Sequence, residues 1–509
     1  MKRSSALYST ALLTFTSLFA QLVGFVYRVF LSRLIGPEVM GLYQLVLPVS
    51  SVLMSLTAVG FTVAASNLSA QYHALGNFKA VDQVVRRCVL GFLLSFAVVC
   101  AAVLLFYDPI SVYLLGDART QLGLVLLLPC VLLTGLENIH KHFFYGTGNV
   151  RPAACTELCE QFIRTGAVLG LLVILLPQNP ERTVGLIVAG MVACEIFSAV
   201  TLTVLYRRAV GPSGRLPGAG TEKKTLNRGI LSIALPIGFT SLLGNLMGAA
   251  NSILIPQRLV HAGADVSAAM SSFGVICGMT LPMLSMPTAF IGAMGLVLLP
   301  KLAESTALGR EEVTRRRIGK AMTATSLLIL PASAILLVIG PTIAQVLFKE
   351  PSAGDFVGPL TAAVVLTCYE SVLAVSLNGI GRQSTAAWNS LLCGGVQLVI
   401  TWVRLGTPGV GLRGYVEGLV VSTVLGVWLN WRAVRRLTGV RFQWFLWCVA
   451  PGLSALLTGL AVNLLFPVLR NAGMDGALAC LVCLGFGAVL YLCALHAQDV
   501  HPVRMFWRR

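Results

Sequence analysis

The chain has 509 residues, of which 56% are hydrophobic and 11% are charged, and its mean hydropathy is +0.83. Soluble domains carry about 25% charged residues, so this composition excludes a soluble protein and indicates an integral membrane protein. The net charge of +17 comes from short basic loops between apolar segments. Membrane topology therefore explains the charge better than a nucleic-acid-binding surface does.

Apolar segments long enough to cross a bilayer recur along the whole chain, and we count about fourteen. They begin near residues 8, 42, 87, 121, 152, 183, 229, 273, 320, 357, 384, 410, 443 and 475. If the N-terminus is cytoplasmic, Lys and Arg in the inner loops outnumber those in the outer loops by more than three to one. The positive-inside rule therefore predicts that both termini are cytoplasmic. Twelve spans would keep much of this pattern and are the alternative.

The first span carries a charged residue, Arg28, on a polar stripe with Ser17 and Gln21. Spacings of four, three and four residues place these side chains and Gly24 on one helical face. A charge at mid-bilayer costs about 2.5–3.5 kcal/mol, so it rarely faces lipid. We predict that this stripe, with Gln44 of the second span, binds substrate. The alternative for Arg28 is an arginine that extends to the outer membrane interface.

Charged residues recur in the fifth and sixth spans. Arg164 follows Glu160 by four residues, which fits a local ion pair as well as it fits a substrate-binding residue. Glu195 has no cation within one helical turn, so it needs a partner from another helix, a bound cation or a proton. Arg28 and Arg164 are candidate partners. Ion coupling is the other interpretation, and we predict Glu195 as the ion-coupling residue.

The second half of the sequence repeats the first, with two lobes of six spans in the same orientation. At an offset of 224, Asn245 corresponds to Gln21, and we include Asn245 in the predicted substrate site. At an offset of 233 the identities are Ala74-Leu75-Gly76 with Ala307-Leu308-Gly309, Thr134 with Thr367, Glu137 with Glu370, Gly146 with Gly379, and Gly148 with Gly381. The last two spans lie outside the repeat.

The predicted architecture is an all-α membrane protein with an N-terminal six-helix lobe (1–206) and a cytoplasmic linker (207–228). A C-terminal six-helix lobe (229–436) follows, and two additional helices with a cytoplasmic tail complete the chain (437–509). The linker is rich in Gly and Pro, as a tether between lobes would be. Cys480 and Cys483 form a CxxC on an apolar helix without a nearby histidine, which favours packing over metal or redox chemistry. No metal or catalytic site is predicted.

One stretch of the first two spans resembles the stage V sporulation protein B group of polysaccharide exporters, and it reads QLVGFVYRVFLSRLIGPEVMGLYQLVLPV (Gln21–Val49). The superfamily of that group includes lipid II flippases and multidrug and toxin extrusion antiporters. The resemblance implies a V-shaped arrangement of the lobes around a cavity for the headgroup of a polyprenyl-pyrophosphate-linked glycan. It implies that Arg28 engages the pyrophosphate and that the last two helices hold the lipid tail.

The predicted function is a flippase for a lipid-linked oligosaccharide or peptidoglycan precursor in the bacterial cytoplasmic membrane. It would work by alternating access and serve cell-wall, spore-cortex or polysaccharide synthesis, with cell-wall synthesis enzymes as candidate partners. No Walker loop is present, so we expect no cofactor and coupling to H+, Na+ or the membrane potential. The alternative is a cation-coupled multidrug antiporter. An enzyme is not expected, because the outer loops are short and their acidic residues scattered.

Overall fold

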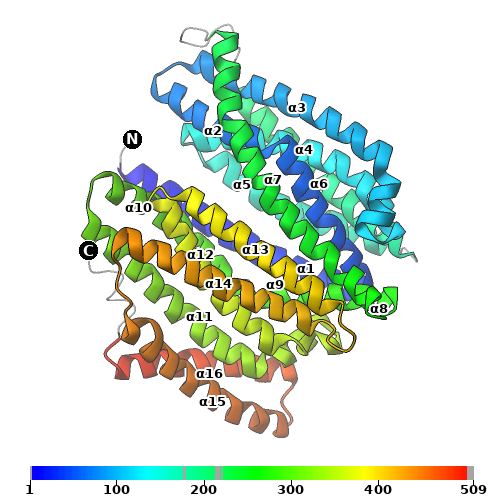
Figure 1. Ribbon diagram of the computed structural model, residues 1–509, viewed down its shortest axis with the longest axis vertical. Coiled ribbons are helices and arrows are strands. Elements are labelled where there is room, and N and C mark those ends of the chain that lie inside the picture. Colours follow the sequence, from blue (N-terminus) through cyan, green and yellow to red (C-terminus); the bar gives the residue numbers. More distant parts are fainter. Residues whose placement is uncertain (1–2, 176–178, 212–217, 219–221, 501–509) are drawn as a thin grey trace. The chain divides into compact units, whose positions relative to one another are not determined.

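The computed structural model describes residues 3–175, 179–211, 218 and 222–500, which form helices joined by short turns and no strand (Figure 1). Helices satisfy their own backbone hydrogen bonds, as the interior of a membrane requires. Thirteen helical segments in this part of the chain are long and apolar enough to cross a membrane. The all-α membrane fold predicted from the sequence is therefore confirmed.

The thirteen segments differ in detail from the fourteen predicted spans. Segment Leu12–Thr57 contains the first two predicted spans, and Val266–Leu284 and Met286–Ala307 divide the eighth. Helix α14 (Arg413–Thr438), the predicted twelfth span, is not among the thirteen because its polar residues lower its mean hydropathy. Span count and helix count thus diverge where helices are merged, broken or unusually polar.

Helix α1 (Arg3–Thr57) is two helices joined at a sharp kink. Fifty-five residues at about 1.5 Å each are far longer than a bilayer is thick. Gly36 has φ +75° and ψ 175°, a conformation that only glycine adopts readily. The first span therefore ends at Gly36, and the second continues into α2 (Val59–Ala74).

The chain folds into two compact units. The first contains the chain up to Tyr27 together with Glu38–Gln257, and the second contains Arg28–Pro37 and the chain from Arg258 onward. Residues 212–217 and 219–221 of the predicted linker lie outside the described residues, between α6, which ends at Val210, and α7, which begins at Lys223. The lobe boundaries predicted from the repeat remain a prediction.

The first unit is built from α2 to α6 together with most of α1 and of α7. The helices after α2 are α3 (Phe78–Pro109), α4 (Gln121–Thr147), α5 (Arg151–Leu175), α6 (Pro180–Val210) and α7 (Lys223–His261). Its main apolar core joins α2, α3 and α4 with the start of α7 and includes the fully buried ring of Phe92. Gly60 of α2 lies directly against the main chain of Ala234 in α7, where a side chain at position 60 would collide with it. This close approach packs α7 into the first unit.

The second unit contains α8 (Val266–Phe273), α9 (Leu281–Leu284), α10 (Met286–Ala307), α11 (Glu311–Phe348), α12 (Val357–Gly379), α13 (Gln383–Leu405), α14, α15 (Ala450–Asn471) and α16 (Gly476–Ala497). The π-helical segment η4 (Gly274–Thr280) joins α8 to α9. Helices α15 and α16 pack side by side against α11 (Figure 1). The CxxC residues Cys480 and Cys483 are buried in this contact with Ile335, Ile339 and Val462, so they act as packing residues.

The turns of the two units repeat at the offset of 233 found in the sequence. Helix α2 ends at Ala74 and α10 at Ala307, and the next helices begin at Phe78 and Glu311. The intervening glycines are left-handed, with φ +70° at Gly76 and +65° at Gly309. The second pair of turns matches as well, with φ +78° at Gly148 and +79° at Gly381. The repeat is therefore a repeat of structure as well as of sequence.

The same offset explains an unusual backbone conformation. Lys349 has φ +55°, and its counterpart in the first unit is Gly116, with φ +79°. The acids that follow are also equivalent, because Asp117 accepts a hydrogen bond from Arg119 N and Glu350 from Ser352 N. Lys349 thus adopts the left-handed backbone conformation that a glycine adopts at the equivalent position of the first unit.

Substituting Lys349 with glycine is expected to stabilise the protein by about 1 kcal/mol, because the left-handed conformation costs a residue with a side chain about 1–2 kcal/mol. Thermal unfolding in detergent would measure the change. The matched variant Gly116→Ala should be destabilised, since its new methyl group would also lie 3.1 Å from the Gln257 side chain. A Lys349→Gly protein less stable than wild type would contradict this interpretation.

Candidate functional site

Two predicted site residues, Arg164 and Glu195, meet inside the first unit. Arg164 projects from α5 and Glu195 from α6, and Arg164 Nη2 lies 3.3 Å from Glu195 Oε1. The same Nη2 atom also donates to Glu160 Oε1, one turn earlier on α5. Arg164 therefore bridges two acids on neighbouring helices, and it is the partner that Glu195 lacked on its own helix.

Helix α4 contributes a hydroxyl to the same cluster. Thr134 Oγ1 lies 2.8 Å from Glu195 Oε2 and 2.8 Å from Cys130 O. A hydroxyl has one proton and can donate it at full strength to only one of these two acceptors. If Thr134 donates its proton to Cys130 O, the contact with Glu195 is a full hydrogen bond only when Glu195 carries a proton and donates it to Thr134 Oγ1.

A third acid, Glu137, extends the cluster along α4. Glu137 Oε1 lies 2.8 Å from Lys141 Nζ, and the charges of Glu137 and Glu195 act on each other. Neighbouring carboxylates repel each other, and a proton on one of them removes the repulsion. Three acids thus share two cations, which leaves one negative charge in excess when all are ionised.

The cluster is enclosed by protein. The exposed fractions of Glu137, Glu160 and Glu195 are 2%, 6% and 4%. Cys194 Sγ lies 3.5 Å from Glu160 O, and the ligand atoms of Glu160, Cys194 and Glu195 lie within 4.8 Å of one another, close enough to hold a cation. Arg164 already supplies a cation at this point, so proton exchange is the chemistry that the cluster fits best. We call these residues the acid–arginine cluster: Thr134, Glu137, Lys141, Glu160, Arg164 and Glu195.

The predicted residues Ser17 and Gln21 belong to the part of α1 that lies beside α5. The ring centroids of Phe19 and Phe162 are 6.2 Å apart, and a Cβ at Gly24 would lie 3.8 Å from Gln161 Oε1. Ser17 is half-buried and Gln21 is exposed. The stripe therefore borders the helix that carries Arg164.

The other two predicted polar residues, Asn245 and Gln44, lie in the first unit and differ in their hydrogen bonding. Asn245 of α7 donates to Ser55 Oγ at 2.5 Å and to Ser51 O at 3.3 Å, so it ties α7 to α1. Gln44 Nε2 is buried and has no hydrogen-bond partner within the described residues. An unsatisfied buried amide is costly. A ligand could therefore supply a hydrogen bond to Gln44 more readily than to Asn245, which already has protein partners.

Arg28 belongs to the second unit, where its charge acts on Cys277 in η4. It is half-buried, and within the described part of the chain it has neither a hydrogen-bond nor an ion-pair partner. Arg33, five residues later, differs. Its guanidinium donates to Val346 O at 2.8 Å and to Leu347 O at 2.5 Å, capping the carbonyl end of α11. Of the two arginines of α1 whose side chains the structure describes, Arg28 and Arg33, Arg28 is the one without a protein acceptor.

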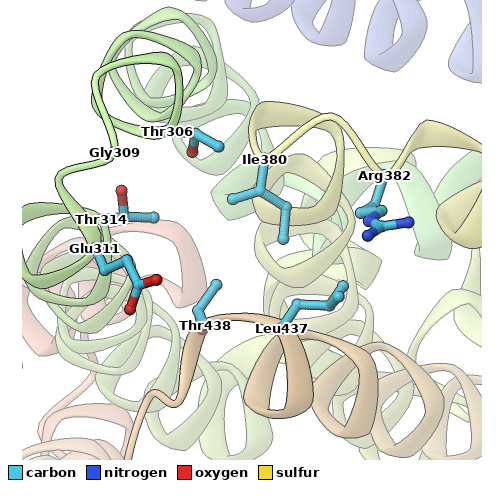
Figure 2. Close-up of a pocket in the computed structure, with 8 residues that line it drawn as sticks. All are labelled: Thr306, Gly309, Glu311, Thr314, Ile380, Arg382, Leu437 and Thr438. Atoms are coloured by element: carbon cyan, nitrogen blue, oxygen red, sulfur yellow. The ribbon is translucent and has the colours of Figure 1, made fainter.

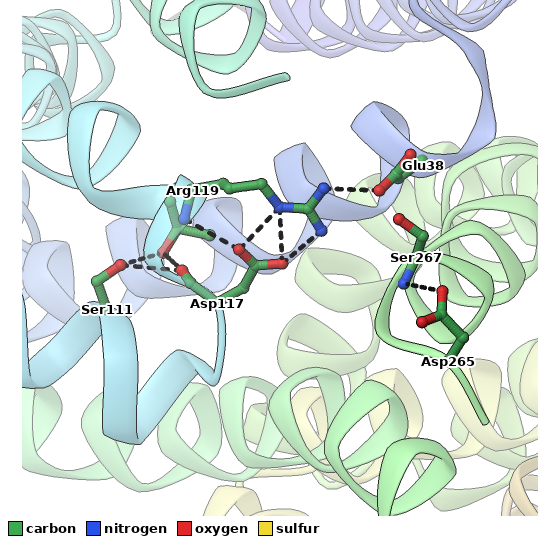
Figure 3. A network of polar contacts seen from close by, with 7 residues as sticks. Glu38, Ser111, Asp117, Arg119, Asp265 and Ser267 are labelled. Atoms are coloured by element: carbon green, nitrogen blue, oxygen red, sulfur yellow. Dashed lines mark hydrogen bonds and ion pairs between the residues drawn. The ribbon is translucent and has the colours of Figure 1, made fainter. Parts of the chain in front are cut away.

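The sequence did not indicate a network at the start of α4 (Figure 3). Arg119 Nη1 binds Glu38 Oε1 at 2.6 Å, and Nη2 binds Asp117 Oδ2 at 2.7 Å. Ser111 Oγ donates to Asp117 O at 3.0 Å, which closes the turn after α3. Glu38 precedes Arg119 by 81 residues, so no local pattern predicts the pair. The network ties the second half of α1 to α4.

Each unit also has a small cavity at equivalent turns. In the second unit a cavity of about 240 Å³ lies between the ends of α10, α11, α12 and α14, with Glu311 and Arg382 in its lining (Figure 2). In the first unit a cavity of about 190 Å³ is lined at the equivalent positions by Phe78 and Asn149. The repeat therefore preserves the cavity but changes its lining from charged to neutral side chains.

Comparison with known proteins agrees with this architecture. The family model described as polysaccharide biosynthesis protein matches residues 6–305, and that of lipid II flippase MurJ matches residues 279–436. The chain is 25% identical to stage V sporulation protein B of Bacillus subtilis (strain 168) over 449 residues, covering 87% of this chain and 86% of that protein. It is 22% identical to lipid II flippase MurJ of the same organism over 446 residues, covering 83% and 80%.

Solved structures share the fold. A lipid II flippase MurJ in an inward closed conformation has a TM-score of 0.66 at 12% identity, covering 96% of this chain and 99% of that one. An inward-facing multidrug resistance MATE family transporter of the MOP superfamily has a TM-score of 0.62 at 16% identity, covering 83% and 96%. The family model that matches residues 6–305 spans more than half of the sequence, and the chain belongs to the polysaccharide biosynthesis protein family.

Proposed function

We propose that the protein is a flippase that moves a polyprenyl-pyrophosphate-linked oligosaccharide or peptidoglycan precursor across the bacterial cytoplasmic membrane. The observation that carries this proposal is the similarity to a lipid II flippase along 83% of the chain. The chain would act as a transporter rather than an enzyme. The lipid-linked glycan and the bilayer are its partners, cell-wall synthesis enzymes would supply or consume the substrate, and both termini would be cytoplasmic.

Arg28 is the residue best suited to the pyrophosphate. A guanidinium donates paired, charge-assisted hydrogen bonds to phosphate oxygens, and in this span it has no protein acceptor within the described residues. An intramembrane charge without a partner is costly, so its retention favours a ligand of opposite charge. Ser17, Gln21 and Gln44 are proposed to contact the same substrate. Asn245 and Arg164, which already have protein partners, are proposed to contact it when those contacts rearrange.

The acid–arginine cluster is proposed to couple transport to protons. Its excess carboxyl group and the contact of Thr134 with Glu195 both favour a bound proton. Release of that proton would leave a buried negative charge in excess and would favour rearrangement of α4, α5 and α6. The change between the two states of alternating access would thus be driven by proton release from the acid–arginine cluster.

The direct test is flipping of a fluorescent polyprenyl-pyrophosphate glycan in proteoliposomes. The purified protein should move this lipid, and protein-free vesicles should not. A fluorescent phospholipid without pyrophosphate serves as the substrate control. If no such glycolipid is moved while an imposed proton or sodium gradient drives efflux of cationic drugs, the multidrug antiporter interpretation would replace this one.

Glu195→Gln is expected to abolish the dependence of flipping on an imposed proton gradient, because the amide keeps the side chain's shape but cannot exchange a proton at neutral pH. Flipping rates with and without the gradient would be compared in the same vesicles. Glu417→Gln is the matched control, since Glu417 is exposed and paired with Arg404 at 2.6 Å. Unchanged gradient dependence in Glu195→Gln would exclude this coupling role.

A further inference from the structure

The repeat places a reduced version of the acid–arginine cluster in the second unit. Glu370 in α12 corresponds to Glu137 in α4, and Thr367 corresponds to Thr134, with each threonine bonded to a carbonyl one turn earlier. The other four members of the cluster are replaced by residues without charge at the offset of 233: Lys141 by Ala374, Glu160 by Cys393, Arg164 by Gln397, and Glu195 by Trp428. Glu370 therefore occupies the position of Glu137 without the cationic partners that Glu137 and its neighbours have.

The surroundings of Glu370 contain no compensating charge. The residue lies in the C-terminal half of α12 and is half-buried, and among the described residues it forms no hydrogen bond and no ion pair. Its carboxyl oxygens lie against Gly426 of α14, where a side chain would collide with them. The glycine thus makes the space that the carboxyl group occupies.

The helices packed against α12 present neutral groups to this acid. From α13 the thiol of Cys393 is its titratable neighbour. The nearby amides of α13 and α14 are occupied with other partners, since Asn389 Nδ2 donates to Asn430 Oδ1 at 2.8 Å and Gln397 Oε1 lies 3.5 Å from Ser422 Oγ. On α11, Ser326 bonds the adjacent Tyr369 at 2.9 Å. No charged side chain of the described residues acts on Glu370 from α10, α11, α13 or α14.

We propose that Glu370 is a proton-binding site of the second unit. An ionised carboxylate without a partner is far more strongly disfavoured in an apolar span than the neutral acid is. One proton therefore moves from water onto a Glu370 oxygen when α12 packs against Gly426, and it returns to water when that contact opens. This site is separate from Glu195 and does not depend on which substrate the protein carries.

Infrared difference spectroscopy of the reconstituted protein tests the site without requiring transport. Wild type should show the carbonyl stretch of a protonated carboxylic acid at neutral pH, and Glu370→Gln should lose the intensity of one such group. Glu417→Gln, which removes an exposed acid paired with Arg404, should leave the band unchanged. Equal band intensity in wild type and Glu370→Gln would overturn the proposal, whatever the outcome of the flipping assay.

A second variant restores the missing partner. Ala374→Lys places a lysine four residues after Glu370, as Lys141 follows Glu137 in the first unit at 2.8 Å. The added cation should keep Glu370 ionised, so the variant should lose the same band as Glu370→Gln although the acid is still present. A band that survives in Ala374→Lys and disappears only in Glu370→Gln would show that a cation at this position does not control the proton. It would contradict the inference that Glu370 holds a proton because it lacks a cationic partner.

Discussion

Replacing Arg28 with alanine is expected to lower the rate of glycolipid flipping by about tenfold or more at matched insertion. A hydrogen bond to a charged group contributes about 1.5–3 kcal/mol, and about 1.4 kcal/mol corresponds to a factor of ten. Because Arg28 has no protein acceptor within the described residues, its removal leaves no buried carboxylate unpaired there. The loss should therefore appear in transport rather than in folding.

Two further variants make this result specific. Arg28→Lys keeps the charge without the paired donors and should retain an intermediate rate. Arg470→Ala removes an arginine that donates to Met474 O at 3.0 Å at the end of α15, and it should flip lipid at the wild-type rate. Full activity in Arg28→Ala would show that the pyrophosphate is bound elsewhere.

Replacing Arg164 with methionine is expected to destabilise the protein by about 3–5 kcal/mol. The substitution leaves Glu160 and Glu195 without their cation, and removing one partner of a buried ion pair typically costs this much. The free energy of unfolding in detergent would give the effect. An exposed pair provides the control, because Arg316→Met breaks a 3.9 Å contact with Glu312 and should cost about 0–1 kcal/mol.

Neutralising the two acids as well shows whether the loss of stability in Arg164→Met comes from unpaired charge or from lost packing. Adding Glu160→Gln and Glu195→Gln to Arg164→Met removes the unpaired charges and should recover most of the lost stability. If the triple variant is no more stable than Arg164→Met, packing of the arginine side chain rather than its charge holds α5 and α6 together.

Several features of the site were accessible from local sequence pattern. The pair of Glu160 and Arg164 is one of the two interpretations that their spacing of four residues on one helix allows, and Glu195 stands out because its helix offers no cation within one turn. The correspondence of Glu137 with Glu370 follows from the repeat alone. The network of Glu38 with Arg119 could not be anticipated, because contacts between distant segments depend on how helices pack and leave no periodic signal.

By itself the sequence determined the class of protein, its apolar spans and its two-fold repeat, since hydropathy, basic loops and left-handed glycines such as Gly76 and Gly309 act locally. Only the tertiary structure decided which charges are paired. Arg164 reaches Glu195 across 31 residues, whereas Arg28 and Glu370 have no partner within the described chain. The physical reason is that a buried charge is stabilised or penalised by what neighbouring helices bring to it, and a sequence lists residues without stating which helices are neighbours.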